Sequence, residues 1–476
     1  MSTTKFWNFS VEEPEFPDNS VSVLDFGAIK GGMISNTAVF NHAIQSVHEQ
    51  GGGHVIVPVG IYLTGPITLL SNVDLHLERG AIVLFTHSEK DYPLIRTDFE
   101  GERRIRALSP IYAENQENIA ITGHGIINGN GHQWRLVKRS KTTDAQWADL
   151  LKRSPLVSGE GAKQVWFPSQ SSFDGHMNPE INADDPDALD RAKKYFDYYR
   201  PEMIKLVSCK RVLIEGVTLQ NSPAWNIHPL FCEHFTLRNV MVRNPWNAQN
   251  GDGLDLESCK YVNITNSRFD VGDDAICMKA GKNAEARKIE IPTECVNIEG
   301  CIVYHGHGGF VVGSEMSRGV RNIRVNNCDF IGTDVGIRFK STLGRGGVVE
   351  DIHIEDVNML DIPKHAIRFT MAYAGAISVD DALPEDIPEF KNITINNINA
   401  LNCGQAIGID GINNDSIHDI FLSNINISAY KGVSVEAARD IYMKNVAVSN
   451  SNDHYKTKIL DGTMGDGFTY LMEEKK

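Results

Sequence analysis

Three aspartates near the middle of the chain are spaced so that they could share one face of the fold. Asp252 follows Asn250-Gly251, and the pair Asp273-Asp274 begins 21 residues after Asp252. Carboxylates held close together repel one another, which raises the pKa of at least one of them. A carboxylic acid that keeps its proton beside an ionised carboxylate is what acid/base hydrolysis of an acetal requires. We therefore predict that these aspartates are catalytic; a polar corner of the fold and a calcium site are the alternatives.

A histidine and two cations follow further along the chain. His307 lies in the glycine-rich run 305–309, and Arg338 and Lys340 alternate along the segment 336–341. Residues at i and i+2 of a strand point to the same face, so both cations should face one ligand. Arginine offers a fork to a carboxylate and lysine a point charge, so the pair suits an anionic sugar. Ordinary salt bridges for the cations, and a hydrogen-bonded wall position for His307, are the competing interpretations.

A repeat organises the part of the chain that carries these residues. From residue 117 onward an apolar-x-apolar pattern recurs at Ile119-x-Ile121, Val212-x-Ile214, Phe235-x-Leu237, Val262-x-Ile264, Val296-x-Ile298, Ile323-x-Val325, Ile352-x-Ile354, Ile393-x-Ile395, Ile420-x-Leu422 and Ile441-x-Met443. After one gap of 93 residues the spacings run from 21 to 41 residues, which is typical of a solenoid. The local period of two and the β-branched residues indicate strands.

The repeat therefore predicts an all-β fold, a right-handed parallel β-helix whose strands stack about 4.8 Å apart. A propeller is the competing architecture, but its blades would recur about every 40 residues. We call the first apolar residue of each repeat a ladder residue. Asp273 and His307 each stand 11 residues after one of these, Val262 and Val296 respectively. Both should then occupy the same strand in consecutive coils.

The chain is expected to form one β-helix domain over residues 1–476, with three regions. Residues 20–100 would form an N-terminal cap and the first coils, because one face of 37–47 is apolar and predicts a capping helix. Asn36 is its expected N-cap, and three glycines from Gly51 end it. The main catalytic coils should occupy 201–450.

An insertion over residues 132–200 interrupts the repeat. It holds three of the six tryptophans and should contain one helix around 187–199. An insertion this long in a solenoid usually lies on the binding face, which is the prediction made for it. A surface excursion with no role in binding is the alternative.

Composition excludes several classes of function. The net charge of −15 opposes broad affinity for nucleic acid or for an anionic membrane, and no apolar run approaches the roughly 20 residues of a membrane span. None of the eight cysteines forms a CxxC pair, so zinc ribbons and thiol redox sites find no support. The N-terminus has no secretory pattern, so we expect a cytoplasmic protein, or an extracellular or periplasmic one if a signal peptide has been removed.

Five motifs together resemble the polygalacturonase family, the family 28 glycoside hydrolases. They are Asn221-Ser222-Pro223-Ala224-Trp225-Asn226-Ile227-His228-Pro229, Asn250-Gly251-Asp252-Gly253, Gly272-Asp273-Asp274, Gly306-His307-Gly308 and Arg338-Phe339-Lys340. The resemblance implies a right-handed parallel β-helix of the pectin-lyase-like type. It also implies hydrolysis of α-1,4-galacturonosidic bonds in pectic polysaccharides or oligosaccharides, with inversion of configuration and without metal or cofactor.

The resemblance also implies roles for single residues. Asp273 would be the general acid, Asp252 and Asp274 would activate water, and His307 would tune the acid. Asn250, Arg338 and Lys340 would bind the substrate, the two cations through its carboxylate. One departure is Gly251, where the family more often carries threonine or another side chain.

The overall resemblance is to bacterial intracellular exo-polygalacturonases, and the long insertion also favours exo action because it could close one end of a groove. A rhamnogalacturonan or xylogalacturonan hydrolase is the main alternative. A calcium-dependent pectate lyase and a non-catalytic carbohydrate-binding β-helix are the others. An inverting pair of carboxyl groups should stand roughly 6.5–9.5 Å apart. The oligomeric state does not follow from the sequence.

Overall fold

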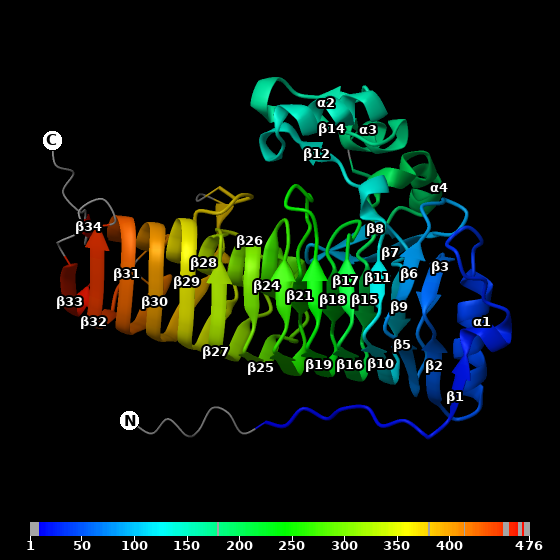
Figure 1. Cartoon of the computed structure of the whole chain (residues 1–476). Helices are drawn as coiled ribbons and strands as arrows, with labels where there is room; N and C mark the ends of the chain where they lie inside the picture. Colours follow the sequence, from blue (N-terminus) through cyan, green and yellow to red (C-terminus); the bar gives the residue numbers. More distant parts are fainter. Residues whose placement is uncertain are drawn as a thin grey trace. The chain divides into compact units, whose positions relative to one another are not determined.

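A computed structural model describes residues 9–178, 180–378, 381–413, 415–450, 457–464 and 469–470. The chain divides into two compact units. The N-terminal unit comprises residues 12–255 and 270–273, and the C-terminal unit comprises residues 1–11, 256–269 and 274–476. Each unit is built mainly from parallel strands, which Figure 1 shows in chain order. None of the described helices is long and apolar enough to cross a membrane.

In the N-terminal unit each complete coil contributes one strand to each of three parallel stacks. The first stack joins β4 (Ile67–Thr68), β9 (Ile111–Glu114), β15 (Ile204–Val207) and β18 (Ile227–Leu230). The second joins β1 (Ser20–Ser22), β2 (Gly53–Val57), β5 (Val73–Leu77), β10 (Glu117–Gly123), β16 (Lys210–Glu215) and β19 (Glu233–Arg238). The third joins β3 (Gly60–Thr64), β6 (Ala81–Phe85), β11 (Ile126–Asn128), β17 (Thr218–Gln220) and β20 (Met241–Arg243).

The predicted ladder is confirmed within this unit. Ile119 pairs with Val212, and Val212 pairs with Phe235, in parallel register. All three side chains are buried. The apolar-x-apolar pattern therefore marks the strand whose side chains fill the interior of the coil.

The capping helix is also confirmed, and it runs two residues beyond the predicted end. Helix α1 (Thr37–Glu49) follows the short 3₁₀ helix η1 (Val23–Phe26) and buries the apolar face that includes Phe40 and Ile44. Asn36 precedes it but does not cap it with its side chain. That amide instead accepts from the backbone N–H of Ile29 and donates to three carbonyls, so it holds the preceding loop together.

The insertion contains more helix than predicted. Besides the expected helical region, present as α4 (Ala188–Ala192) and the kinked 3₁₀ segment η5 (Lys193–Tyr198), it holds α2 (Asp144–Arg153) and α3 (Gln170–Met177). A small antiparallel sheet accompanies them: β12 (Val137–Lys138), β13 (Val157–Ser158) and β14 (Val165–Trp166). An antiparallel hairpin of β7 (Leu94–Phe99) and β8 (Glu102–Ala107) precedes the insertion and packs against α4.

In the C-terminal unit the strands are longest in the middle of the unit and shorten again towards the C-terminus. They are β22 (Lys260–Thr265), β24 (Asp274–Lys279), β25 (Thr293–Glu299), β26 (Ile302–Val312), β27 (Val320–Ile331), β28 (Thr333–Lys340), β29 (Val348–Thr370), β30 (Glu389–Asp410), β31 (Ile417–Glu436), β32 (Ile441–Asn450), β33 (Thr457–Met464) and β34 (Thr469–Tyr470). Strands β21 (Leu254–Glu257) and β23 (Arg268–Asp270) each carry residues of both units. Helix α5 (Asn283–Arg287) and the 3₁₀ helix η7 (Pro384–Asp386) lie in loops of the C-terminal unit.

The ladder continues through this unit in the predicted register. Parallel pairs join successive ladder residues in the order Val262, Val296, Ile323, Ile352, Ile393, Ile420 and Ile441. Each coil therefore stacks on the one before it, and the residue spacing read from the sequence corresponds to one turn of the β-helix.

Candidate active site

Residues outside the segment 250–253 donate hydrogen bonds to its backbone carbonyls and hold it in place. The buried Asn244 side chain donates to the carbonyl oxygens of Gly251, at 3.1 Å, and of Asp252, at 3.3 Å. The backbone N–H of Gly272 donates to the Gly251 carbonyl at 3.2 Å. These bonds place the residue before Asp252 beside the residue before Asp273.

Asp252 and Asp273 consequently stand at equivalent places in consecutive coils of the N-terminal unit. Their nearest carboxylate oxygens lie within 4.8 Å. Asp252 is buried and Asp273 is partly exposed, so their surroundings differ. This distance joins single oxygens, whereas the roughly 6.5–9.5 Å expected for an inverting pair separates two whole carboxyl groups. The distance between these two groups therefore does not by itself favour inversion.

Gly251, the departure from the family pattern, has a steric explanation. A Cβ at this position would stand 2.6 Å from the Cβ of Ala248. The loop that contains Ala248 also covers Gly272, where a Cβ would lie 2.5 Å from the carbonyl oxygen of Pro245. The two glycines thus let this loop pack directly on the backbone next to Asp252 and Asp273.

Asn250 lies at the wall of a pocket of about 310 Å³. Its side chain has a fixed partner, because the buried Arg200 guanidinium donates to the Asn250 amide oxygen at 2.9 Å. Arg200 also donates to the carbonyls of Gln249, at 2.8 Å, and Pro223, at 3.0 Å. The end of the insertion thereby fixes the position of the predicted substrate-binding residue.

The pocket beside Asn250 is rich in basic side chains. Arg104 and Arg106 of β8 line it together with Arg200, and the insertion contributes Lys138 and His176 among others. Burial, followed by the nearby Arg106, lowers the pKa of Arg200 to about 10, so its guanidinium still carries its charge at neutral pH. Although two glutamates also line the pocket, these surroundings favour an anionic ligand.

In the C-terminal unit Asp274 forms a charged cluster with Arg338 and Lys340. The Lys340 ammonium donates to one carboxylate oxygen at 2.6 Å, and an Arg338 N–H donates to the other at 3.5 Å. The side chains of Asp274 and Lys340 are 2% and 7% exposed, against 20% for Arg338. The aromatic ring of Tyr373 lies 5.0 Å from the Lys340 nitrogen.

This cluster keeps Asp274 ionised. Burial alone would raise the pKa of Asp274, but Lys340, Arg338 and then His307 hold it well below its usual range. Pairing with Asp274 likewise raises the pKa of Lys340 despite its burial. An aspartate of this kind suits the activation of water and not proton donation. Its pairing with Lys340 also disfavours a metal ion on this carboxylate.

Gly308 permits the cluster to form across an intervening coil. Asp274 pairs with Gly308 of β26, the residue after His307, and Gly308 pairs with Val335 of β28. A Cβ on Gly308 would lie 3.4 Å from an Asp274 oxygen and 3.7 Å from the Cδ of Arg338. The absence of a side chain at this position therefore leaves room for the two charged groups to meet.

The structure thus brings the seven predicted residues together in two groups. Asn250, Asp252 and Asp273 belong to the N-terminal unit, and Asp274, His307, Arg338 and Lys340 to the C-terminal unit; one peptide bond joins Asp273 to Asp274. Arg338 and Lys340, the two cations predicted to bind the substrate, both contact Asp274, and Arg338 is the more exposed of the two.

Several residues of these surroundings were not predicted, namely Arg104, Arg106, Lys138, Arg200 and Tyr373. The arginines lie outside the repeat, in the hairpin and the insertion, so no periodicity relates them to Asn250. For Arg104 and Arg106 the available signal was the basic run 103–106 on an otherwise acidic chain.

A buried charged cluster lies within the N-terminal unit. The Glu202 carboxylate accepts from Lys205 at 2.9 Å and contacts His228 at 3.1 Å, with all three side chains at most 1% exposed. Burial alone would raise the pKa of Glu202, but Lys205 and His228 hold it well below its usual range. This ionisation stabilises the fold above the unfolded pKa, and the contribution is lost as the pH falls towards the folded pKa.

We expect Glu202→Gln to lower the free energy of unfolding by about 3–5 kcal/mol at pH 7, since it leaves Lys205 buried without its carboxylate. Denaturant unfolding at pH 7 and pH 3 checks this. The difference in free energy of unfolding between the variant and the unmodified chain should be smaller at pH 3. Glu233→Gln, at the exposed pair with Lys210, should change the free energy by less than about 1 kcal/mol. A difference that does not vary with pH would contradict the assignment.

Comparison with known proteins places the chain among carbohydrate hydrolases. Residues 190–451 match the family model of the glycosyl hydrolases family 28. The solved structure of an exopolygalacturonase from Thermotoga maritima superposes with a TM-score of 0.77 at 31% identity, over 98% of this chain and 97% of that chain. The two chains therefore share one fold, which confirms the predicted right-handed parallel β-helix.

Two curated relatives extend over most of the chain. An exo-poly-alpha-D-galacturonosidase from Dickeya chrysanthemi is 28% identical over 90% of this chain and 71% of its own length. An endo-polygalacturonase from Pectobacterium carotovorum is 24% identical over 88% of this chain and 89% of its own length. Because the family model spans more than half of the residues and the similarity to the Thermotoga structure spans nearly all of them, the chain belongs to family 28 of the glycosyl hydrolases.

Proposed function

We propose that this chain is an exo-polygalacturonase that hydrolyses α-1,4-galacturonosidic bonds of polygalacturonate or oligogalacturonides. Membership of family 28 supports glycoside hydrolysis. The observation that carries the substrate is the basic pocket beside Asn250, because its arginines match the carboxylates of galacturonate. The relatives named for exo action on galacturonans support the same assignment.

Asp273 is the proposed general acid that protonates the leaving oxygen. Asp252 and Asp274 are the proposed groups that activate water. The surroundings of Asp274 support its part in this division, because Lys340 and Arg338 hold its carboxylate ionised. His307 tunes the acid, and Asn250 and Arg338 contact the substrate. The observed pairing of Lys340 gives it the further task of keeping Asp274 charged.

Exo action follows from the insertion in this proposal. Side chains of the insertion, including Lys138, His176 and Tyr198, wall the pocket that Asn250 also lines. A walled pocket accepts the end of a chain, whereas an open groove binds along its length. The enzyme would therefore release product from a chain end.

A time course on polygalacturonate tests the mode of cleavage. We expect monogalacturonate from the first minutes, with little loss of viscosity, because each event shortens the polymer by its end. Early mixed oligomers and a rapid fall in viscosity would show endo action. Rhamnogalacturonan and xylogalacturonan assayed beside polygalacturonate separate the alternative substrates, and insensitivity to chelator separates hydrolysis from calcium-dependent elimination.

The stereochemistry is tested by NMR of the first-formed sugar. We propose inversion, in which water attacks from the face opposite the leaving group in one displacement. A first-formed product that retains its anomeric configuration would contradict the roles given to Asp252, Asp273 and Asp274. The test is informative because the distance between Asp252 and Asp273 does not itself favour inversion.

A further inference from the structure

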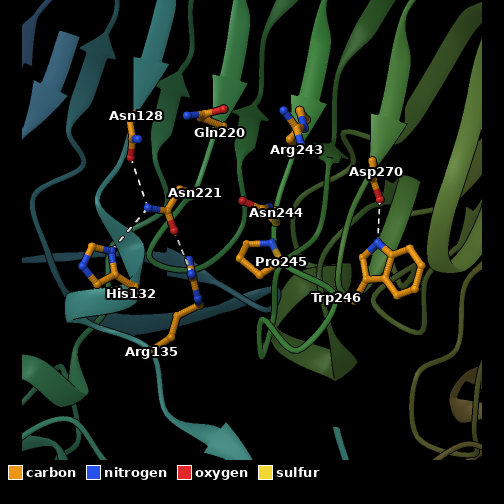
Figure 2. Close-up of a pocket in the computed structure, with 10 residues that line it drawn as sticks. All are labelled: Asn128, His132, Arg135, Gln220, Asn221, Arg243, Asn244, Pro245, Trp246 and Asp270. Carbon is orange, nitrogen blue, oxygen red and sulfur yellow. Dashed lines mark hydrogen bonds between the residues drawn. The ribbon is translucent and has the colours of Figure 1, made fainter. Parts of the chain in front are cut away.

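A second pocket of the N-terminal unit lies apart from the one that Asn250 lines. It has a volume of about 480 Å³ and is formed where β11, β17, β20 and β23 end (Figure 2). None of the residues proposed for catalysis or substrate binding lines it. One residue links the pocket to the segment 250–253. Asn244 lines the pocket, and its side chain also donates to the carbonyls of Gly251 and Asp252.

Polar side chains follow one edge of this pocket at the regular step of the β-helix. Asn128 pairs with Gln220, and Gln220 pairs with Arg243, each as the last residue of its strand. Figure 2 shows these three and Asp270 in a row at the ends of successive strands. Neighbouring positions are therefore about 4.8 Å apart. A ladder of hydrogen-bonding groups at the scale of a sugar ring suits a repeating saccharide.

The cations of the pocket favour a negatively charged ligand. Arg135 is 4% exposed, and its guanidinium donates to neutral oxygens, the Asn221 amide at 2.8 Å and the carbonyl of Ser222. Burial, followed by Arg200, lowers the pKa of Arg135 to about 9, so it remains charged at neutral pH. Arg243 belongs to the row of strand-end residues and is exposed, so it supplies an accessible positive charge to the same pocket.

An exposed tryptophan completes the pocket. Trp246 is 62% exposed, and its indole N–H donates to Asp270 at 2.7 Å. This bond fixes the orientation of the ring and gives a partner to Asp270, the acidic residue that lines the pocket. A large aromatic face held in place beside polar groups offers an apolar surface to the C–H face of a pyranose. Figure 2 shows the indole on the same side of the strand ends as Pro245.

We propose that this pocket is an accessory binding site for an acidic oligosaccharide. Trp246 stacks on a sugar ring, Arg243 binds a carboxylate, and Asn128 and Gln220 bind hydroxyl groups. The choice of galacturonate among acidic sugars rests on the proposed function, whereas the site itself rests on the residues of the pocket. Its role is to hold a galacturonan chain on the protein without cleaving it.

Isothermal titration of the Asp273→Asn variant with trigalacturonate tests this site. We expect two equivalents of ligand to bind, one in each pocket, and the Trp246→Ala substitution to leave one. Arg243→Ala should weaken the same class of sites by roughly ten-fold or more, because a charge-assisted hydrogen bond is lost. Both side chains are exposed, and thermal unfolding of each variant verifies the fold.

Matched controls are Tyr430→Ala, an aromatic ring that is 50% exposed, and Arg268→Ala, an exposed arginine outside the pocket. Neither should change the isotherm, and a neutral trisaccharide should not bind the accessory site. Equal binding of trigalacturonate with and without Trp246 would overturn the proposal, as would displacement of the ligand by inorganic phosphate at equal concentration. A single equivalent that Trp246→Ala abolishes would support the accessory site and count against the proposed function of the Asn250 pocket.

Discussion

Replacement of Asp273 by asparagine is expected to lower kcat on polygalacturonate by at least about 10²–10⁴-fold. Asparagine has nearly the same shape but no acidic proton to give to the leaving oxygen. The substitution also removes one of two carboxylates whose oxygens lie within 4.8 Å. Because the loss is confined to the chemical step, KM should change far less than kcat.

Steady-state kinetics and product NMR measure this effect. Asp329→Asn is the matched control: Asp329 accepts from Asn358 at 3.0 Å on the outside of the C-terminal unit, and an asparagine oxygen can accept the same bond. That variant should keep the unmodified kcat. Should Asp273→Asn retain more than about a tenth of kcat, proton transfer by Asp273 would not be part of the mechanism.

Replacement of Lys340 by methionine is expected to have the second large effect, on stability and on the pH profile. The change leaves the Asp274 carboxylate, 2% exposed, without the ammonium that stands 2.6 Å from it. Breaking a buried pair in this way costs about 3–5 kcal/mol of unfolding free energy. Denaturant unfolding at pH 7 measures that loss.

The pH dependence has a definite sign. Lys340 and Arg338 hold the pKa of Asp274 well below its usual range, so the ionised form persists as the pH falls. Without Lys340 the carboxylate binds a proton at higher pH, and the acid limb of the kcat profile should move upward. An acid limb that stays in place would show that Asp274 ionisation does not control the reaction.

Two further variants separate charge from packing. Lys364→Met removes an exposed ion pair of 2.8 Å with Asp334 and should cost less than about 1 kcal/mol. Adding Asp274→Asn to Lys340→Met removes the unpaired charge and should restore part of the stability. If the double variant is no more stable than Lys340→Met alone, the loss arises from the missing lysine side chain and not from the buried carboxylate.

Local patterns were sufficient for the coils and insufficient for the insertion. The alternation at Val262, Val296 and their successors predicts both the strands and their register, because one misplaced residue would turn each apolar side chain out of the interior. Helix α2 was missed although Thr143 and Gln146 form a capping box that the sequence displays. Helix α3, eight residues long, has no comparable apolar periodicity to reveal it.

The sequence by itself determined the parallel coils, the capping helix and the order of the motifs that carry Asp252, Asp273, Asp274, His307, Arg338 and Lys340. These features depend on which residue types recur at which spacing, and both are visible in the sequence. Tertiary structure alone decided that Lys340 pairs with Asp274, that Arg200 holds Asn250, and that Arg243 and Trp246 line one pocket. Such contacts join residues separated by loops of irregular length, where direction and distance depend on how each loop folds against its neighbours and not on any repeat.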